Sequence, residues 1–303
     1  MKTNKLLCAF LFLFLYCFNA NSQDNDLLKL VDTAKPQKEY VKNAFKSSRV
    51  INGHSMEFIG KGVMDVRILH RFGLINSGIE NLFGLDQANM RFGFDYGLGR
   101  SLTIGAGRSN VGKEWDAFVK FRPIWQSTGP RSVPFSVVLV SGITLSTMPW
   151  TDPDRKNYFS SRVAYYHTVI VGRKFSEAFS LQLSPTFVHR NLVALEADEN
   201  DAVAIGVGGR LKLTKRIAFV ADYHHIVLRV GSGAFQHPLS VGFDIETGGH
   251  VFQLHFSNST GMNEKAFITS TTDKWSKGDI RFGFNLSRVF TLKKPKRDLI
   301  KSE

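Results

Sequence analysis

The stretch LSVGFDIETGGHVFQLHF, from Leu239 to Phe256, constrains the fold more than any other part of the chain. Its first half alternates between apolar and polar or small residues, which is the period of two expected of a strand with two different faces. Gly248-Gly249 supplies the positive φ angles of a tight two-residue turn. The turn predicts a hairpin that pairs Ile245 with Phe252, Phe243 with Leu254 and Val241 with Phe256 on an apolar face, and Glu246 with Val251, Asp244 with Gln253 and Gly242 with His255 on a polar face.

The same alternation recurs along the chain from Gly62 onward. The cleanest example is 89–98, where apolar residues at even positions oppose polar residues and glycines at odd positions. Segments of about 9 to 11 residues are long enough to cross a membrane as tilted strands. We expect strands at 63–72, 89–98, 101–108, 114–125, 133–146, 159–171, 179–188, 203–213, 217–225, 239–247, 250–256 and 280–290.

The connections between these segments alternate in length. Short turns are expected at 99–100, 126–131, 173–178, 214–216 and 248–249, and longer loops at 73–88, 147–157, 191–202, 228–238 and 257–278, with 109–113 as a short exception. An even number of strands with short turns at one end and long loops at the other is typical of outer-membrane barrels, whereas a soluble sandwich does not require it. We therefore predict an all-β fold: a single-domain, antiparallel, up-and-down transmembrane β-barrel of about 12 strands.

Aromatic residues fit the same interpretation. They fall near the expected strand ends on the apolar face, as in the interfacial girdles of membrane barrels. They are Tyr96, Trp115, Trp125, Tyr165, Tyr223 and Phe290.

The N-terminus has the pattern of a secretory signal peptide over residues 1–22: two lysines, an apolar run from Leu6 to Phe18, and small polar residues before Gln23. Both cysteines of the chain, Cys8 and Cys17, lie in this segment, so we expect no disulfide or thiolate site in the exported protein. Residues 23–61 then form a periplasmic segment, in which 44–52 is either a short strand or a plug. The barrel is expected at 62–291 and a basic periplasmic tail at 292–303.

The chain is basic, with a formal net charge of +13. No basic stripe with interleaved aromatics resembles a nucleic-acid module, and an exported chain rarely meets nucleic acid. We expect outer-membrane lipids and lipopolysaccharide to be its anionic partners instead, since a basic excess favours contact with their headgroups. The predicted location is the cell outer membrane.

Six blocks of sequence resemble a family of uncharacterised β-barrel proteins of Bacteroidota, known as a domain of unknown function. The resemblance implies an outer-membrane barrel. It brings no established activity, and no catalytic residue can be carried over from it. The blocks are AFKSSRVINGHS from Ala44, GKGVMDVRILHRFG from Gly60, DAFVKFRPIWQSTG from Asp116, VGRKFSEAFSLQLSPTFVHRNL from Val171, ETGGHVFQLHFSNS from Glu246 and GDIRFGFNLSRVFTLK from Gly278.

Two local motifs suggest ligand sites. Residues 107–113 have the spacing of a phosphate-binding loop, but Glu114 replaces the final Ser or Thr and a strand follows instead of a helix, so we expect a surface hairpin. Asp244, Glu246, His250 and His255 resemble a metal cluster in linear sequence. The hairpin register places His250 on the opposite face and leaves Asp244 and His255 as a diagonal lumen pair, too few ligands for a typical metal site. We expect no metal and no cofactor.

A lipid-modifying enzyme is the alternative function. His189 or His225 falls on a predicted outward face, where it could serve as a base. No serine with an orienting Asn or Asp stands at strand-compatible spacing, so we expect no catalytic residue and no enzyme activity.

The predicted inward face carries charges of both signs. Ions removed from bulk water are costly unless they are paired, so one interpretation is a salt-bridged and nearly closed interior, and the other is a narrow pore for small polar or anionic solutes. We expect a narrow channel, a transporter, or a scaffold whose loops bind a surface or periplasmic protein. The lumen-lining candidates are Asp65, Arg67, Arg71, Arg91, Asp95, Asp116, Lys120, Arg122, Arg162, Arg210, Asp222, Asp244, His255 and Arg281.

Overall fold

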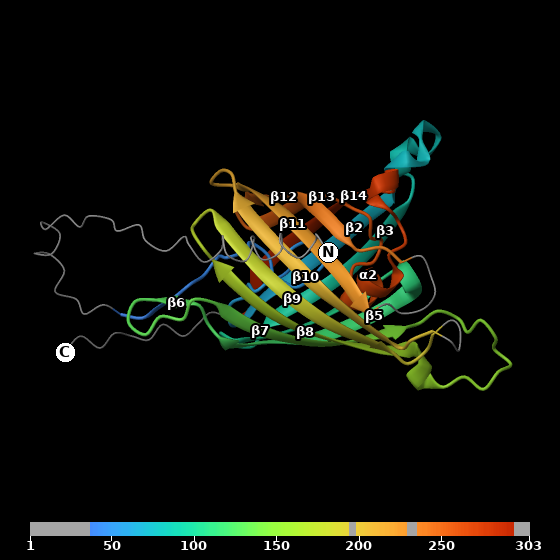
Figure 1. Cartoon of the computed structure of the whole chain (residues 1–303), viewed down its shortest axis with the longest axis horizontal. Coiled ribbons are helices and arrows are strands. Elements are labelled where there is room, and N and C mark those ends of the chain that lie inside the picture. Colours follow the sequence, from blue (N-terminus) through green and yellow to red (C-terminus); the bar gives the residue numbers. More distant parts are fainter. Residues whose placement is uncertain (1–36, 194–197, 229–234, 294–303) are drawn as a thin grey trace, which may run out of the picture. The chain divides into compact units, whose positions relative to one another are not determined.

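A computed structural model describes residues 37–193, 198–228 and 235–293 (Figure 1). The chain divides into two compact units, Met1–Gln37 and Lys38–Glu303. All strands and helices discussed below belong to the second unit. The predicted signal segment 1–22 and all but the first two residues of the tail 292–303 lie outside the described residues.

Twelve antiparallel strands form a closed barrel in which each strand pairs with its neighbours in the chain and the last pairs with the first. The fold class predicted from the sequence is confirmed. The strands are β2 (Val63–Leu74), β3 (Ala88–Gly97), β4 (Leu102–Ser109), β5 (Glu114–Ile124), β7 (Ser136–Ser146), β8 (Val163–Lys174), β9 (Phe179–Arg190), β10 (Asp201–Lys212), β11 (Ile217–Leu228), β12 (Leu239–Thr247), β13 (His250–Ser257) and β14 (Arg281–Thr291). A separate two-stranded sheet joins β1 (Glu39–Tyr40) to β6 (Ser127–Thr128).

The hairpin of β12 and β13 has the register that the sequence predicts. Phe243 lies opposite Leu254 and Asp244 opposite Gln253, and Gly248 has a φ of +65° in the turn. Two other strands begin three or four residues later than predicted. β7 begins at Ser136, after Pro134, whose missing N–H cannot contribute to a strand ladder, and β8 begins at Val163, after a short 3₁₀ turn.

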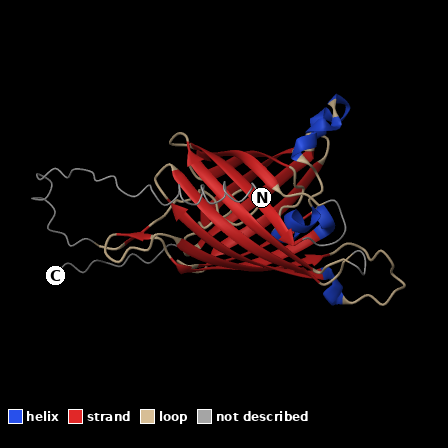
Figure 2. Cartoon of the chain, in the orientation of Figure 1, coloured by secondary structure: helices blue, strands red, loops and turns tan. Residues whose placement is uncertain are grey.

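Short turns lie at one end of the barrel and long connections at the other, as predicted. The short-turn end includes one longer member, 125–135, which carries β6. The helices gather at the long-loop end (Figure 2). They are η2 (Ile75–Ser77), η3 (Ile79–Gly84), η4 (Val111–Lys113), η5 (Phe159–Arg162), α2 (Glu264–Ser270) and η6 (Trp275–Lys277). Among the described residues, no helix is long and apolar enough to cross a membrane.

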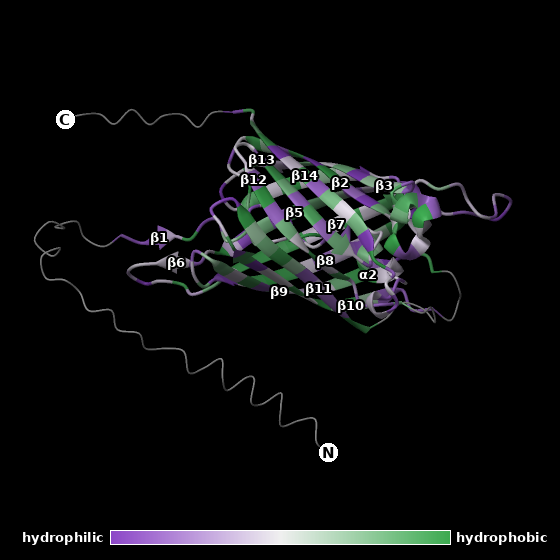
Figure 3. Ribbon diagram, turned by 90° about the horizontal axis from the view of Figure 1, so that it is seen from above, coloured by the Kyte–Doolittle hydropathy of each residue, from purple (hydrophilic) through white to green (hydrophobic). Residues whose placement is uncertain are grey.

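The two faces of the barrel wall differ in polarity. Outward positions are mostly apolar and exposed, for example Phe94, Leu139 and Phe243, which gives the green outer stripes of Figure 3. Inward positions are buried and mostly polar. Basic and acidic side chains are buried in equal number within the described part of the chain: Arg49, Arg67, Arg71, Arg91, Lys120, Arg122 and Arg210 against Asp65, Asp95, Glu114, Asp116, Asp222, Asp244 and Glu264.

Residues 41–62, here called the inserted segment, fill the lumen. The segment starts at the short-turn end, where the Val41 amide donates to the Gln126 carbonyl, and it returns there, where the Gly62 amide donates to the Gly97 carbonyl. Between these points it reverses direction, with a hydrogen bond from the Val50 amide to the Gly53 carbonyl (2.9 Å). The stretch 44–52, which the sequence left as strand or plug, is largely buried and forms no part of the barrel sheet.

Candidate functional site

The tip of the inserted segment is anchored to the far wall of the barrel. The backbone amides of Asn52 and Gly53 both donate to Asp222 Oδ2 on β11, at 2.8 and 2.9 Å. The Asn52 side chain donates to Ser240 Oγ on β12 (3.0 Å). Gly53 allows this close approach, since a Cβ there would lie 3.1 Å from the His224 ring. The tip is therefore fixed by hydrogen bonds to polar wall groups.

Three basic side chains of the wall are held by neutral oxygen atoms of the inserted segment. Lys120 Nζ donates to the carbonyls of Ser48 (3.2 Å) and Glu57 (2.6 Å). The Arg122 guanidinium donates to the Met56 carbonyl, and Arg71 Nη2 donates to Asn52 Oδ1 (2.8 Å). None of the three wall cations forms an ion pair in the part of the chain that the structure describes. The segment thus supplies the oxygen atoms that a bound anion or water would supply.

The wall acids near these cations have partners of their own. Arg67 Nη1 lies 3.3 Å from Asp95, and Arg91 Nε donates to Asp116 at 2.8 Å. Asp65 accepts from Ser287 Oγ at 2.6 Å. The acidic charges are therefore neutralised or hydrogen-bonded within the wall.

The opposite end of the lumen is closed by α2, which belongs to the long β13–β14 connection. Asn263 caps this helix by accepting from the Ala266 amide (2.8 Å), and it also donates to Glu114 Oε2 of β5 (3.1 Å). Phe267 is completely buried, with its ring 4.7 Å from the His224 ring. The helix therefore packs inside the barrel mouth and not above it.

The inserted segment and α2 meet at a buried ion pair. Arg49 Nη1 lies 3.0 Å from Glu264 Oε1, and both side chains are at most 2% exposed. His54 Nε2 is 3.6 Å from the same carboxylate oxygen. Burial, together with the positive charges of Arg49 and Lys120, lowers the pKa of His54 well below its usual range. A neutral His54 leaves Arg49 as the charge that balances Glu264.

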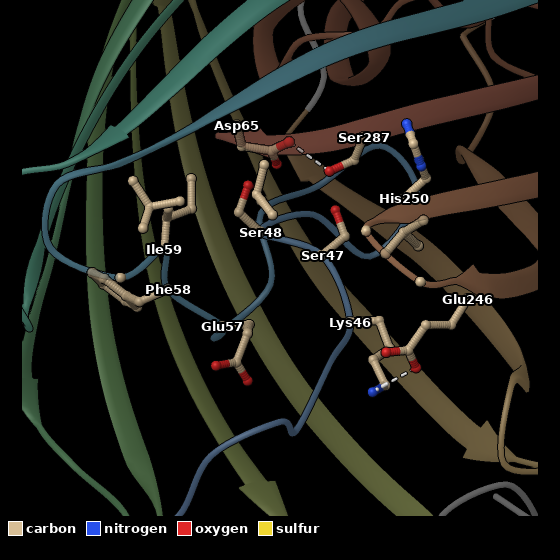
Figure 4. Close-up of a pocket in the computed structure, with 16 residues that line it drawn as sticks. Lys46, Ser47, Ser48, Glu57, Phe58, Ile59, Asp65, Glu246, His250 and Ser287 are labelled. Atoms are coloured by element: carbon tan, nitrogen blue, oxygen red, sulfur yellow. Dashed lines mark hydrogen bonds and ion pairs between the residues drawn. The ribbon is translucent and has the colours of Figure 1, made fainter. Parts of the chain in front are cut away.

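Pockets open on the short-turn side of the inserted segment. One of about 350 Å³ is lined by both the segment and the wall, with Lys46 and Glu246 paired across it at 2.7 Å (Figure 4). A larger one of about 800 Å³ lies beside Trp125, where the Arg100 guanidinium lies 4.7 Å from the Trp125 ring and 3.9 Å from the Tyr40 ring. The inserted segment lines both pockets, so a solute entering from this side meets it directly.

Most of the lumen-lining candidates are buried inside the barrel. Two are not. Arg162 lies in η5, before β8 begins, and donates to the carbonyl of Ser146, the last residue of β7. Arg281 lies at the barrel rim and pairs with Asp273 at 2.8 Å. The buried candidates are Asp65, Arg67, Arg71, Arg91, Asp95, Asp116, Lys120, Arg122, Arg210, Asp222, Asp244 and His255.

The expected lumen pair of Asp244 and His255 does not form. Asp244 accepts from Gln253, which lies directly opposite it, at 2.6 Å. Neither ring nitrogen of His255 has a hydrogen-bond partner among the described residues. Among the described residues, no group of three or more His, Cys, Asp or Glu side chains is placed to hold a metal ion. The motif at 107–113 lies in the β4–β5 hairpin.

Sequence reasoning missed the residues that close the lumen. They lie in the inserted segment and at the start of α2. Two sequence signals could have indicated them: the AFKSSRVINGHS block and the helix start at Asn263-Glu264. The missed residues are Arg49, Asn52, His54 and Glu264.

Comparison with known proteins identifies the barrel region. Residues 45–290 match the model of a family described as "Membrane bound beta barrel domain (DUF5777)". No curated protein matches the sequence. Similar solved structures include the NanC porin (7% identity, TM-score 0.46, 75% of this chain and 98% of that chain). Another is OmpT of Vibrio cholerae, with 11% identity, a TM-score of 0.39, and coverage of 78% of this chain and 100% of that chain. A third is the toluene transporter TbuX of Ralstonia pickettii, with 10% identity, a TM-score of 0.38, and coverage of 83% of this chain and 97% of that chain.

Proposed function

The chain belongs to this family of membrane-bound β-barrels, and from that premise we propose that it is an outer-membrane channel for small anionic solutes, held closed by its own inserted segment. The observation that carries the proposal is the way Lys120, Arg122 and Arg71 are satisfied by neutral oxygens of that segment. If the segment leaves, Lys120 and Arg122 lose the hydrogen bonds described above, and Arg71 keeps only the His70 carbonyl and Asn285 Oδ1, both neutral. Wall acids such as Asp95 and Asp116 keep their cationic partners.

The contact between the segment and the charged side of the wall is suited to exchange with water. A permanently closed barrel would be expected to pair its inward cations with acids, because a buried unpaired charge is costly. Here many of the contacts are hydrogen bonds, each worth only about 0.5 to 1.5 kcal/mol net because water can replace it. Replacing the segment by water therefore costs less on this side than opening an apolar core would.

The other side of the lumen favours the closed state. Phe45, Val50 and Met56 belong to one apolar cluster with wall residues such as Val138 and Ile170. Moving these side chains into water exposes apolar surface at about 25 cal/mol per Å². In our proposal the closed state therefore predominates, and the segment moves out toward the short-turn end, where it enters and leaves the barrel.

A disulfide lock tests the proposal. A Cβ placed at Gly208 would lie 2.8 Å from Val50 Cγ2, close to the separation of a Cβ atom and the distal sulfur in a disulfide. In a chain with Cys8 and Cys17 changed to serine, V50C/G208C should give discrete openings in planar bilayers when reduced and none when oxidised.

A second variant tests the channel function independently of the disulfide. Replacing 43–58 by a flexible Gly-Ser linker should give a constantly open pore, with a reversal potential in a KCl gradient that shows preference for chloride. Folding is checked by heat-modifiable mobility on gels. A folded linker variant without conductance, or a V50C/G208C protein that conducts equally in both redox states, would contradict the channel.

Several expectations from the sequence form part of this proposal. They are export through the signal segment 1–22, an origin in the Bacteroidota, contact with lipopolysaccharide and the absence of chemistry of its own. The six sequence blocks and the N-terminal pattern support the first two. The outer membrane is the membrane in which closed antiparallel barrels of this organisation occur in bacteria.

A further inference from the structure

A serine and a histidine are hydrogen-bonded on the outside of the barrel. Ser141 Oγ and His167 Nδ1 lie 3.0 Å apart, and both side chains are exposed. Ser141 is the central residue of β7, and His167 lies directly opposite it on β8. The pair therefore stands at mid-height on the surface that faces the hydrocarbon core of the membrane.

The surroundings of this pair are apolar. Leu139, Ile143 and Val169, its outward neighbours along the two strands, are each 41 to 43% exposed. On the described strands, His189 and Arg288 are outward polar side chains that lie toward the strand ends, whereas His70 lies four residues from the end of β2 with its ring stacked on that of Phe284. A polar group that faces lipid cannot find a hydrogen-bond partner there, so its presence at mid-height requires a reason.

The pair satisfies only part of its own hydrogen-bonding capacity. His167 uses Nδ1, and its Nε2 has no hydrogen bond to any described residue. Ser141 Oγ keeps capacity for a further bond, since a hydroxyl has one donor and two acceptor sites. One donor and one acceptor are thus presented outward side by side, and a rotated copy of the same pair is complementary to it.

A groove adjoins the pair on the same surface. It has a volume of about 390 Å³ and is lined by Ala117, Val119, Ser141, Ile143 and Tyr165, among others. A hollow of this size admits one or two large apolar side chains. Protein surfaces that associate within membranes use small residues for close approach and polar side chains for hydrogen bonds across the interface.

We infer that the outer surface of β7 and β8 is a dimer interface, whose occupant is a second copy of this chain. A two-fold axis near Ser141 and His167 sets each pair against its equivalent and each groove against the neighbouring apolar side chains, as an isologous interface requires. Lipid is a poorer occupant because acyl chains offer no hydrogen bonds. The inferred dimer interface does not depend on the proposed channel function.

A catalytic use of the pair fits the geometry less well. A serine nucleophile and its histidine need a third group that orients the ring and donors for an oxyanion. His167 lies opposite Phe187 on β9, and no described carboxylate or amide bonds to its ring. The ester bonds of lipids also lie near the membrane interfaces, away from mid-height.

Site-specific photo-crosslinking of the full chain in outer-membrane vesicles tests the interface. A photoreactive residue at Val169 lies beside the pair. The same residue at Leu286 is the matched control, because Leu286 is the central residue of β14, across the barrel from β8. We expect a covalent dimer from position 169 and none from 286. The double substitution S141V/H167L should reduce the yield at 169 at least tenfold.

The alternatives give different results. Equal yields at 169 and 286, or a yield at 169 that S141V/H167L leaves unchanged, would overturn the interface, as would a monomeric mass for the purified protein in mild detergent. Phospholipid hydrolysis that is lost in S141A would overturn it in favour of a catalytic pair. Native gel mobility and heat modifiability verify that each variant is folded.

Discussion

At the scale of single residues, the contact of Arg49 with Glu264 holds together the two parts of the chain that fill the lumen. It joins the inserted segment to α2 across 215 residues of sequence, and both groups are removed from solvent. The attraction of a buried pair largely compensates for the loss of hydration, but removing one partner leaves an unpaired charge in the interior. Each half of the pair therefore holds the other half in place.

We expect E264L to lower the free energy of unfolding by about 3 to 5 kcal/mol, the usual cost of breaking a buried pair. R49M/E264L should be much closer to the parent than the sum of its single substitutions, because it leaves no unpaired charge. Urea unfolding in lipid vesicles, followed by tryptophan fluorescence, measures both.

The surface pair Lys174 and Glu177, 2.7 Å apart but with Glu177 87% exposed, is the matched control, and E177Q should leave stability nearly unchanged. If E264L and the double variant are equally destabilised, the two residues are not coupled.

At the scale of elements, the strands could be predicted from sequence and the inserted segment could not. A strand of the wall separates lipid from a polar interior, so its residues alternate, and the β12–β13 register follows from that alternation and the turn. The middle of the inserted segment, 44–56, is almost entirely buried within protein and has no such period. Arg162 shows a further limit, since alternation continues beyond the point where the ladder of β8 begins.

Adjacent glycines of β10 provide a test of how the wall accommodates the segment. Gly208 faces inward, and a Cβ there would approach Val50 Cγ2 to 2.8 Å. Gly209 faces outward, and the nearest atom to its Cβ would be Leu181 Cδ1 at 3.8 Å. We expect G208V to displace the segment and G209V to leave it in place.

Limited proteolysis of the folded protein from the short-turn side measures this displacement. G208V should increase cleavage after Lys46 at least severalfold and raise the frequency of channel openings, whereas G209V should resemble the parent in both. The same response from the two variants would show that contact with Val50 does not hold the segment.

At the scale of the whole molecule, the barrel is defined by the contrast between its two faces. The sequence shows most of the wall charges that lie inside and that both signs are present, but it misses Arg49 and Glu264. It cannot show which of them pair, because Arg67 meets Asp95 and Lys120 meets carbonyl oxygens only through the curvature of the closed wall and the course of the inserted segment.

Depth in the membrane should decide the cost of an outward charge. Phe243 is central in β12, whereas Phe290 lies near the end of β14, two residues from the outward Arg288. We expect F243R to destabilise the barrel by about 2 to 4 kcal/mol and F290R by about 0 to 1 kcal/mol. Folding yield and urea titration in vesicles compare them. Equal losses would mean that the assigned membrane boundaries are wrong.

The inserted segment also bears on how the barrel is made. The seam between β2 and β14 joins parts of the chain that are far apart in sequence, and bringing such parts together is entropically costly and slow. The Asn52 amide donates to Asp222, and the side chains of Gln253 and Asn285 donate to the carbonyls of residues 50 and 51, which joins the inserted segment to β11, β13 and β14. Because β2 follows the segment directly in the chain, contacts of the segment with β13 and β14 also bring β2 close to β14. The segment that blocks the lumen thus also favours closure of the wall at its seam.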